Sequence, residues 1–282
     1  MGILNSWAGA AGWALAALLL GGCAGIPSPA ERLEAADRLA ASQGWQRTWL
    51  EGGAFRLAAY HPAIATPTAQ LTVYLEGDGL AWISADQASV DPTPTDPLAL
   101  RLALAQGSDA VAYLGRPCQY VGAVATGCPQ RHWRQQRFAL DVVEATSHAL
   151  DQLKHRVSAR SLRLVGYSGG GTVAALVAAR RNDVDLLVTV AGNLDTAAWT
   201  AWHRVTPLHG SLNPADETGA LSRVRQHHFA GGQDHTVPPG LLKDFVSRLH
   251  ASAPVRWHLE PMFDHRCCWD QAWAQRLEAA AE

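Results

Sequence analysis

The sequence predicts an α/β protein with a mostly parallel central sheet and helices on both faces. Short, nearly continuous apolar runs of strand length alternate with stretches of about 10–15 residues in which apolar side chains recur at helical spacing. The chain has 282 residues, 48% of them apolar, which is enough for one sizeable core. In sheets of this kind, functional side chains gather at the carboxyl ends of the strands.

The first half of the chain contains signals for two helices and several short strands. Ser28-Pro29-Ala30-Glu31 is a capping box with proline at the first helical position, and it predicts a helix that ends near Gln43. Gly52 and Gly53 mark a turn between two strands. The other elements expected here are strands at residues 45–51, 55–60, 71–75 and 109–115, and a helix at 98–106.

After residue 115, predicted strands and helices continue to alternate, and two irregular segments interrupt them. Residues 115–135 and 192–224 show little periodicity, so both are expected to be irregular. Apolar residues recur at helical spacing from Phe138 to Val157. The remaining expected elements are strands at 161–167, 184–192, 224–232 and 255–261, and helices at 171–181, 238–251 and 268–282.

Composition excludes some partners. The formal net charge is −2, and no run of Lys or Arg is present, so nucleic acid is not an expected partner. Eleven tryptophans are many for this length. Each is more simply explained as a large core or rim residue than as part of an aromatic-lined pocket.

The N-terminal segment differs from the rest of the chain. Residues 1–22 include an apolar, uncharged run that is short for a membrane span and typical of a signal peptide. Leu20-Gly21-Gly22-Cys23 resembles a bacterial lipobox, in which the cysteine is lipidated and becomes the new N-terminus. Residues 23–30 then form a tether, and residues 23–282 form a single domain.

These signals predict an exported protein of the cell envelope, anchored to a membrane through lipid on Cys23. Ala24 after the cysteine favours the outer membrane. The alternative is an ordinary signal peptide cleaved just after Gly22-Cys23-Ala24, which would give a soluble secreted protein.

Export implies an oxidising compartment, and four cysteines remain after Cys23. Cys118 and Cys128 enclose a short Gly-rich loop and are natural disulfide partners. Cys267 and Cys268 would then form a vicinal bridge or stay as free thiols, while cross-links between the two pairs are the competing arrangement. The cysteine spacing fits no zinc pattern, so neither a metal nor a cofactor is expected.

Gly166-Tyr167-Ser168-Gly169-Gly170 is a G-x-S-x-G motif between a predicted strand and a predicted helix. A serine in this turn takes a strained conformation that lifts its oxygen out of the backbone. Glycines two residues before and after it avoid collisions with neighbouring backbone. The following helix offers free N–H groups where negative charge is stabilised. Ser168 is therefore the candidate nucleophile.

A nucleophilic serine needs a base and an orienting carboxylate. Asp234 follows a predicted strand, and His265 follows the last one, in the order expected for this topology. His235 is the alternative base. Asp195, which follows the preceding strand, is the alternative acid.

The oxyanion formed during acyl transfer needs two N–H donors. Gly169 supplies the first, and Asp78, in the turn after the strand at 71–75, is expected to supply the second. Glu76 stands where hydrolases of this type carry histidine. Arg116 or Arg134 is expected to pair with these two acidic side chains.

With these motifs the chain resembles the α/β-hydrolase superfamily, and more closely poorly characterised bacterial lipoprotein-type α/β hydrolases. The resemblance covers about residues 70–270 and implies a serine hydrolase that cleaves a small, ester-like substrate. The expected pocket roof is residues 116–135 and 193–215. The residues expected to touch substrate are Trp199, Trp202, His203 and Leu208. Peptidase, thioesterase and acyltransferase activities use the same triad, and a non-catalytic envelope lipoprotein is the other alternative.

Overall fold

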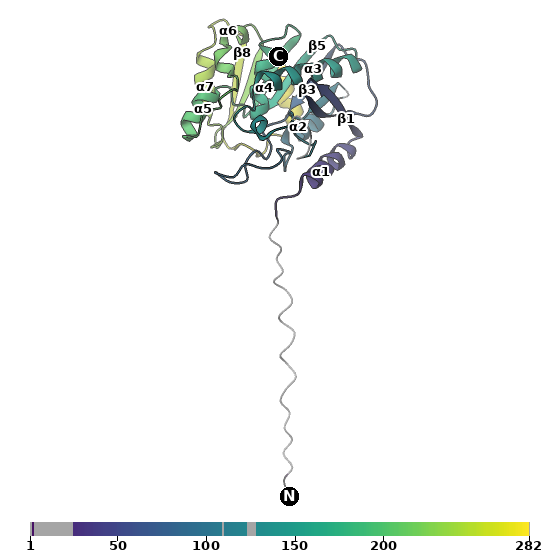
Figure 1. The fold of residues 1–282 in the computed structure, drawn as a ribbon. Helices are drawn as coiled ribbons and strands as arrows, with labels where there is room; N and C mark the ends of the chain where they lie inside the picture. Colours follow the sequence, from purple (N-terminus) through teal and green to yellow (C-terminus); the bar gives the residue numbers. More distant parts are fainter. Residues whose placement is uncertain (1, 3–24, 109, 123–127, 282) are drawn as a thin grey trace.

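The structure is a computed structural model that describes residue 2 and residues 25–108, 110–122 and 128–281 (Figure 1). The helices are α1 (Pro29–Ala41), α2 (Leu98–Gln106), α3 (Leu140–Arg156), α4 (Gly169–Ala178), α5 (Thr196–His203), α6 (Thr218–Leu221), α7 (Pro239–Ser247) and α8 (Trp273–Ala281), with 3-10 helices η1 (Gln130–Trp133) and η2 (Pro214–Asp216). The strands are β1 (Trp45–Gly52), β2 (Phe55–Pro62), β3 (Gln70–Leu75), β4 (Val111–Leu114), β5 (Ser161–Tyr167), β6 (Val184–Val190), β7 (Gln226–Gly231) and β8 (Val255–Glu260).

Cys23 and the predicted signal segment, apart from residue 2, lie outside the described residues. Of residues 23–30, which were predicted to form a tether, Pro29 and Ala30 belong to α1. Among the described helices, none combines the length and the apolar character needed to cross a bilayer.

The eight strands form one sheet in the order β1-β2-β4-β3-β5-β6-β7-β8. β1 pairs antiparallel with β2, and β2 pairs antiparallel with β4. All the other neighbouring strands are parallel. The predicted fold class, a mostly parallel sheet with helices on both faces, is confirmed. Parallel order brings the ends of β3, β5, β7 and β8 to one edge of the sheet.

The central strands are apolar along their length because both of their faces are covered. The last five residues of β3 and all four of β4 are buried. On one face α3, α4 and α7 supply core residues such as Leu150, Val173 and Phe245. On the other, α1, α2 and α8 supply residues such as Ala36 and Leu102. The two cores hold the sheet rigid from both sides.

The segment at 192–224 is more ordered than the sequence suggested, because it contains α5, η2 and α6. Asp195 begins α5 by accepting a hydrogen bond from Ala198 N at 3.1 Å, and Asn213 caps η2 in the same way. These helices are short, with eight residues in the longest, so they give little apolar periodicity. The sequence signal that could have revealed them is the Asp or Asn residue that caps each helix start, Asp195 for α5 and Asn213 for η2.

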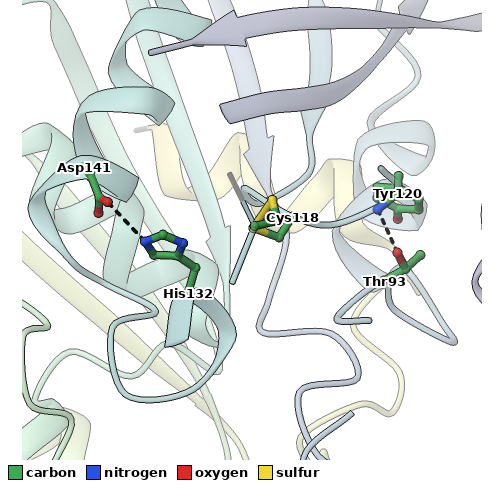
Figure 2. The surroundings of a disulfide bond; sticks show 6 residues. Thr93, Cys118, Tyr120, His132 and Asp141 are labelled. Atoms are coloured by element: carbon green, nitrogen blue, oxygen red, sulfur yellow. Dashed lines mark hydrogen bonds and ion pairs between the residues drawn. A yellow bond between two sulfur atoms is a disulfide. The ribbon is translucent and has the colours of Figure 1, made fainter. Parts of the chain in front are cut away.

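Residues 115–122 are held close to the sheet by several contacts (Figure 2). Tyr120 N donates to Thr93 Oγ1 at 2.7 Å, and Tyr120 Oη lies 2.9 Å from Tyr113 Oη on β4. A disulfide joins Cys118 to Cys128, just before η1. The structure also joins Cys267 to Cys268 in a vicinal disulfide. The segment after β4 is therefore tied to both the sheet and η1.

We predict that a Cys118→Ala/Cys128→Ala double variant loses about 3 kcal/mol of unfolding free energy, because a cross-link over a separation of 10 residues restricts the unfolded chain. Urea denaturation measures this loss. A Cys267→Ala/Cys268→Ala variant is the matched control, since adjacent residues close almost no loop. Equal losses in the two variants would contradict the loop-closure explanation.

Candidate active site

Ser168 lies in a sharp turn between β5 and α4. Its backbone angles are φ 52° and ψ −122°, a region that residues with a side chain rarely adopt. Neighbouring backbone is close on both sides. A Cβ on Gly166 would lie 2.4 Å from the carbonyl oxygen of Gly170, and a Cβ on Gly170 would lie 2.2 Å from that of Leu75. Only glycine fits at these two positions, as the motif predicted.

The structure brings the three predicted side chains together. Ser168 Oγ lies 3.0 Å from His265 Nε2, and His265 Nδ1 lies 2.8 Å from Asp234 Oδ2. The carboxylate accepts a hydrogen bond from Nδ1–H, and this tautomer leaves the lone pair of Nε2 directed at the serine hydroxyl. Residues far apart in the sequence therefore form one continuous hydrogen-bonded chain.

Backbone groups fix the orientation of the acid and the base. The second carboxylate oxygen of Asp234 accepts hydrogen bonds from Thr236 N at 2.8 Å and Val237 N at 2.7 Å. The Asp234 side chain is 0% exposed and that of His265 is 14% exposed. Tyr167 Oη donates to the carbonyl oxygen of His265 at 3.2 Å. The Asp234 carboxylate and the His265 backbone are therefore both held in place, and the imidazole Nε2 faces the serine.

The alternative acid, Asp195, and the alternative base, His235, form no hydrogen bond with Ser168 or His265, all four being residues that the structure describes. Asp195 accepts hydrogen bonds from Ala198 N and Asn213 Nδ2 and forms an ion pair with Arg248. His235 is exposed and does not line the cavity beside Ser168. Asp195 therefore begins a helix and anchors α7, while Asp234 is the acid in contact with the imidazole.

Ser168 opens into a cavity of about 300 Å³. Gly169, at the first position of α4, and Asp78, in the loop after β3, both line this cavity. The two residues predicted to supply oxyanion donors thus both line the cavity beside the serine, and Gly169 lies at the positive end of a helix. Within the described residues there is no group of three or more His, Cys, Asp or Glu side chains that could hold a metal ion.

Two arginines hold the Asp78 carboxylate. Arg116 Nη1 lies 3.2 Å from Oδ1, and Arg137 Nη1 lies 2.6 Å from Oδ2. Burial opposes ionisation of Asp78, but the two guanidinium charges outweigh it and keep its pKa below the ordinary value. Arg116 was expected here. Arg134 was not a correct alternative, because its guanidinium lies over the Trp82 ring.

These two ion pairs, which we call the clamp, help to tie three loops together beside Ser168. Arg116 also donates to the carbonyl oxygen of Arg137, and Gln119 Nε2 donates to that of Gly77 at 2.9 Å. A Cβ on Gly169 would lie 2.0 Å from Asp78 Oδ1, so the clamped carboxylate packs directly against the turn that holds Ser168. Arg137 and Gln119 had no sequence signal, because their partners lie in distant loops.

Glu76 replaces the expected histidine and is nearly inaccessible, with 1% of its surface exposed. Its Oε1 accepts a hydrogen bond from Gly77 N at 2.8 Å, while Oε2 is buried without a hydrogen-bond partner among the described residues. Burial raises the pKa of Glu76 to about 7, against the opposing effect of the Gly77 N–H group. Near neutral pH a proton therefore resides on this carboxyl group much of the time.

The walls of the cavity differ in part from the sequence expectation. Trp199 lines it, with its indole Nε1 donating to Thr236 O at 2.7 Å. Trp202 is 64% exposed and does not line the cavity, because it projects from α5 into solvent. His203 contacts Thr236 O instead of the cavity. The loop at 79–96, which was not predicted to contribute, supplies a wall that includes Trp82.

No protein-family model matches the chain, and no curated protein matches it in sequence. Solved structures of similar fold include an α/β serine hydrolase homologue from Coxiella burnetii, with 16% identity, a TM-score of 0.55, and coverage of 83% of this chain and 95% of that one. A putative dienelactone hydrolase from Klebsiella pneumoniae has 16% identity, a TM-score of 0.58, and coverage of 84% and 99%. An esterase from Pyrococcus furiosus has 12% identity, a TM-score of 0.59, and coverage of 85% and 91%.

These likenesses establish the fold. The chain has the α/β-hydrolase fold, as its motifs predicted.

The raised pKa of the buried Glu76 carboxyl group predicts that the free energy of unfolding depends on pH. Between pH 4.5 and about 7 the folded protein keeps a proton on Glu76 that the unfolded chain releases, so the free energy of unfolding falls as pH rises through this window. The loss amounts to about 3 kcal/mol and is complete above the folded pKa of about 7.

Urea denaturation of the wild type and Glu76→Gln at pH 5 and pH 8 tests this prediction. The wild type is expected to lose unfolding free energy between pH 5 and pH 8, whereas Glu76→Gln, which has no carboxyl group to ionise there, should not show this loss. Glu144→Gln removes an exposed carboxylate on α3 and is the control. If Glu76→Gln and the wild type lose the same free energy between the two pH values, Glu76 titrates normally.

Proposed function

We propose that this protein is a serine hydrolase that cleaves carboxylic esters through an acyl-enzyme intermediate. The observation that supports this most directly is the pair of contacts from Ser168 Oγ to His265 Nε2 at 3.0 Å and from His265 Nδ1 to Asp234 Oδ2 at 2.8 Å. They occur in a strained strand-to-helix turn that opens into a cavity. A serine oriented in this way toward a neutral imidazole is suited to nucleophilic attack.

In the proposed reaction, Ser168 Oγ attacks the ester carbonyl carbon while His265 Nε2 takes the hydroxyl proton. The tetrahedral intermediate collapses, the bond to the alcohol breaks, and His265 returns the proton to the leaving alkoxide. A water molecule, deprotonated by His265, then attacks the acyl-enzyme. The carboxylic acid leaves and Ser168 regains its proton. Asp234 stabilises the imidazolium in both halves of the reaction.

The N–H groups of Gly169 and Asp78 are proposed to bind the oxyanion. Each such donor contributes about 3 kcal/mol to transition-state stabilisation in enzymes of this kind. The Asp78 carboxylate would weaken this site if it were free, because it is negatively charged. Its contacts with Arg116 and Arg137 place two positive charges against that one negative charge. The clamp therefore keeps the loop in place and makes its electrostatic field compatible with an oxyanion.

The names of structural neighbours agree with this reaction class. The Pyrococcus furiosus protein is called an esterase, and the Klebsiella pneumoniae protein is called a putative dienelactone hydrolase. The cavity of about 300 Å³ is of the size that small-molecule sites usually have. We therefore propose a small-molecule ester as the substrate.

We further propose that the hydrolase is exported and anchored to a membrane through lipid on Cys23. This rests on the apolar segment at residues 1–22 and the lipobox-like Leu20-Gly21-Gly22-Cys23.

Metabolic labelling with an alkyne fatty acid is expected to label the wild type in a bacterial host and to leave Cys23→Ser unlabelled. The label should partition with the membrane fraction. Secreted protein of the same size with no lipid label would show instead that the segment is an ordinary signal peptide.

A fluorophosphonate probe tests the proposed catalysis directly. We expect the wild type to be labelled and Ser168→Ala to remain unlabelled, because the probe reacts only with an activated serine. Asp234→Asn should lower kcat on p-nitrophenyl acetate by about 10⁴-fold, since the wrong imidazole tautomer then faces the serine.

Asp195→Asn is the matched control, because asparagine keeps the cap of α5. It should retain activity within about tenfold of wild type, as expected for a residue outside the reacting group. A wild type that neither reacts with the probe nor hydrolyses any ester in a chain-length series would indicate a non-catalytic protein on a hydrolase fold.

A further inference from the structure

A second hollow adjoins the cavity beside Ser168. It has a volume of about 770 Å³ and shares Trp82, Arg137 and Trp199 with that cavity. A ligand with its ester at Ser168 can therefore extend past these shared residues into the second space. We call this second hollow the arginine groove, after Arg134 and Arg204, which line it.

The arginine groove combines apolar walls with positive charge. Its apolar side chains include Trp82, Trp199 and Leu208, and no Asp or Glu is among its lining residues. Asp86, which directly follows the lining residues Ser84 and Ala85, is an exposed carboxylate at the rim and accepts a hydrogen bond from Ser84 Oγ. The lining therefore carries positive charge only, and the nearby rim carboxylate of Asp86 is outnumbered by Arg134 and Arg204.

The two arginines that give the groove its charge differ from Arg137. Arg137 is committed to Asp78 and to the carbonyl oxygen of Arg134. The Arg134 guanidinium lies over the Trp82 ring, 5.0 Å from its centre, and donates a hydrogen bond to the neutral Gln130 side chain at 3.4 Å. Neither Arg134 nor Arg204 has an ion pair among the described residues. Two guanidinium groups are thus available to an anion.

Arg204 also has an unusual backbone. It ends α5 in the left-handed region, with φ 53° and ψ 40°, where glycine is the usual residue. An arginine in this conformation is strained relative to glycine, because its Cβ approaches the neighbouring carbonyl oxygen. The strain is accompanied by a side chain that lines the groove. This is consistent with a functional use for the charge at this position.

We propose that the arginine groove binds the distal, carboxylate-bearing end of the substrate. The substrate class is then a small amphiphilic ester with an apolar body and a terminal anion. The body packs between Trp82, Trp199 and Leu208, and the anion pairs with Arg204 and Arg134. This proposal rests on the proposed ester hydrolysis at Ser168 and adds the substrate class to it.

The test compares charged and neutral esters of equal length. One series places the charge on the acyl side, as p-nitrophenyl monoesters of dicarboxylic acids from succinate to suberate against p-nitrophenyl alkanoates. The other places it on the alcohol side, as acetyl esters of 4-hydroxyphenylalkanoic acids against their methyl esters. The measured quantity is the ratio of kcat/KM for the charged ester to that for the neutral one.

In one of the two series, the wild type is expected to favour the charged ester once its chain is long enough to reach the groove. Arg204→Gln and Arg134→Gln should each lower the ratio by about three- to tenfold, as for a partly exposed charged contact. Arg204→Glu should lower it further by repelling the carboxylate. Raising the ionic strength should also lower the wild-type ratio.

Arg160→Gln is the matched control. Arg160 is an exposed arginine just before β5, at the end of that strand opposite Ser168. The ratio of kcat/KM values for Arg160→Gln should equal that of the wild type. Equal ratios in the wild type and Arg204→Glu in both series would overturn the proposal. Labelling of Ser168 by the fluorophosphonate probe separates the two failures: a labelled enzyme without charge preference refutes only the groove, whereas an unlabelled one refutes the hydrolase.

Discussion

The close approach of β3, β5 and α4 around Ser168 is the constraint on which the rest of the site depends. Gly170 lies so near the carbonyl oxygens of Leu75 and Glu76 that no side chain fits there. This contact forces the turn into the conformation that directs Ser168 Oγ toward His265. The apolar strands and the two flanking cores hold the backbone in this strained state, since local preferences alone would relax it.

Each buried or partly buried carboxylate around this turn, except Glu76, has hydrogen-bond donors or positive charges that compensate for its burial. Asp234 is buried, but its carboxylate accepts hydrogen bonds from two backbone N–H groups and from the imidazole. These three donors compensate for the loss of water around it. Asp78 is balanced by Arg116 and Arg137. Arg134 and Arg204 in the groove have no such ion pair among the described residues, and this contrast separates them from the charges that hold the site together.

The elements with strong local signals were predictable. The capping box at Ser28, the buried strands and the G-x-S-x-G turn all follow from short-range chemistry, and the structure has them at nearly the expected bounds. Asp234 and His265 were also found, because the ends of successive parallel strands meet at one edge of the sheet. The short helices at 196–221 were missed, since they are too brief to show apolar periodicity.

The sequence by itself thus determined the fold class and the candidates for nucleophile, acid and base, because these depend on periodicity and on the position of residues after strands. Only the tertiary structure decided between Asp234 and Asp195, selected Arg116 over Arg134 and added Arg137, and placed Trp202 in solvent while Trp199 lines the cavity. Those choices depend on which loops meet in space and on which direction each side chain takes, and neither is encoded by local spacing along the chain.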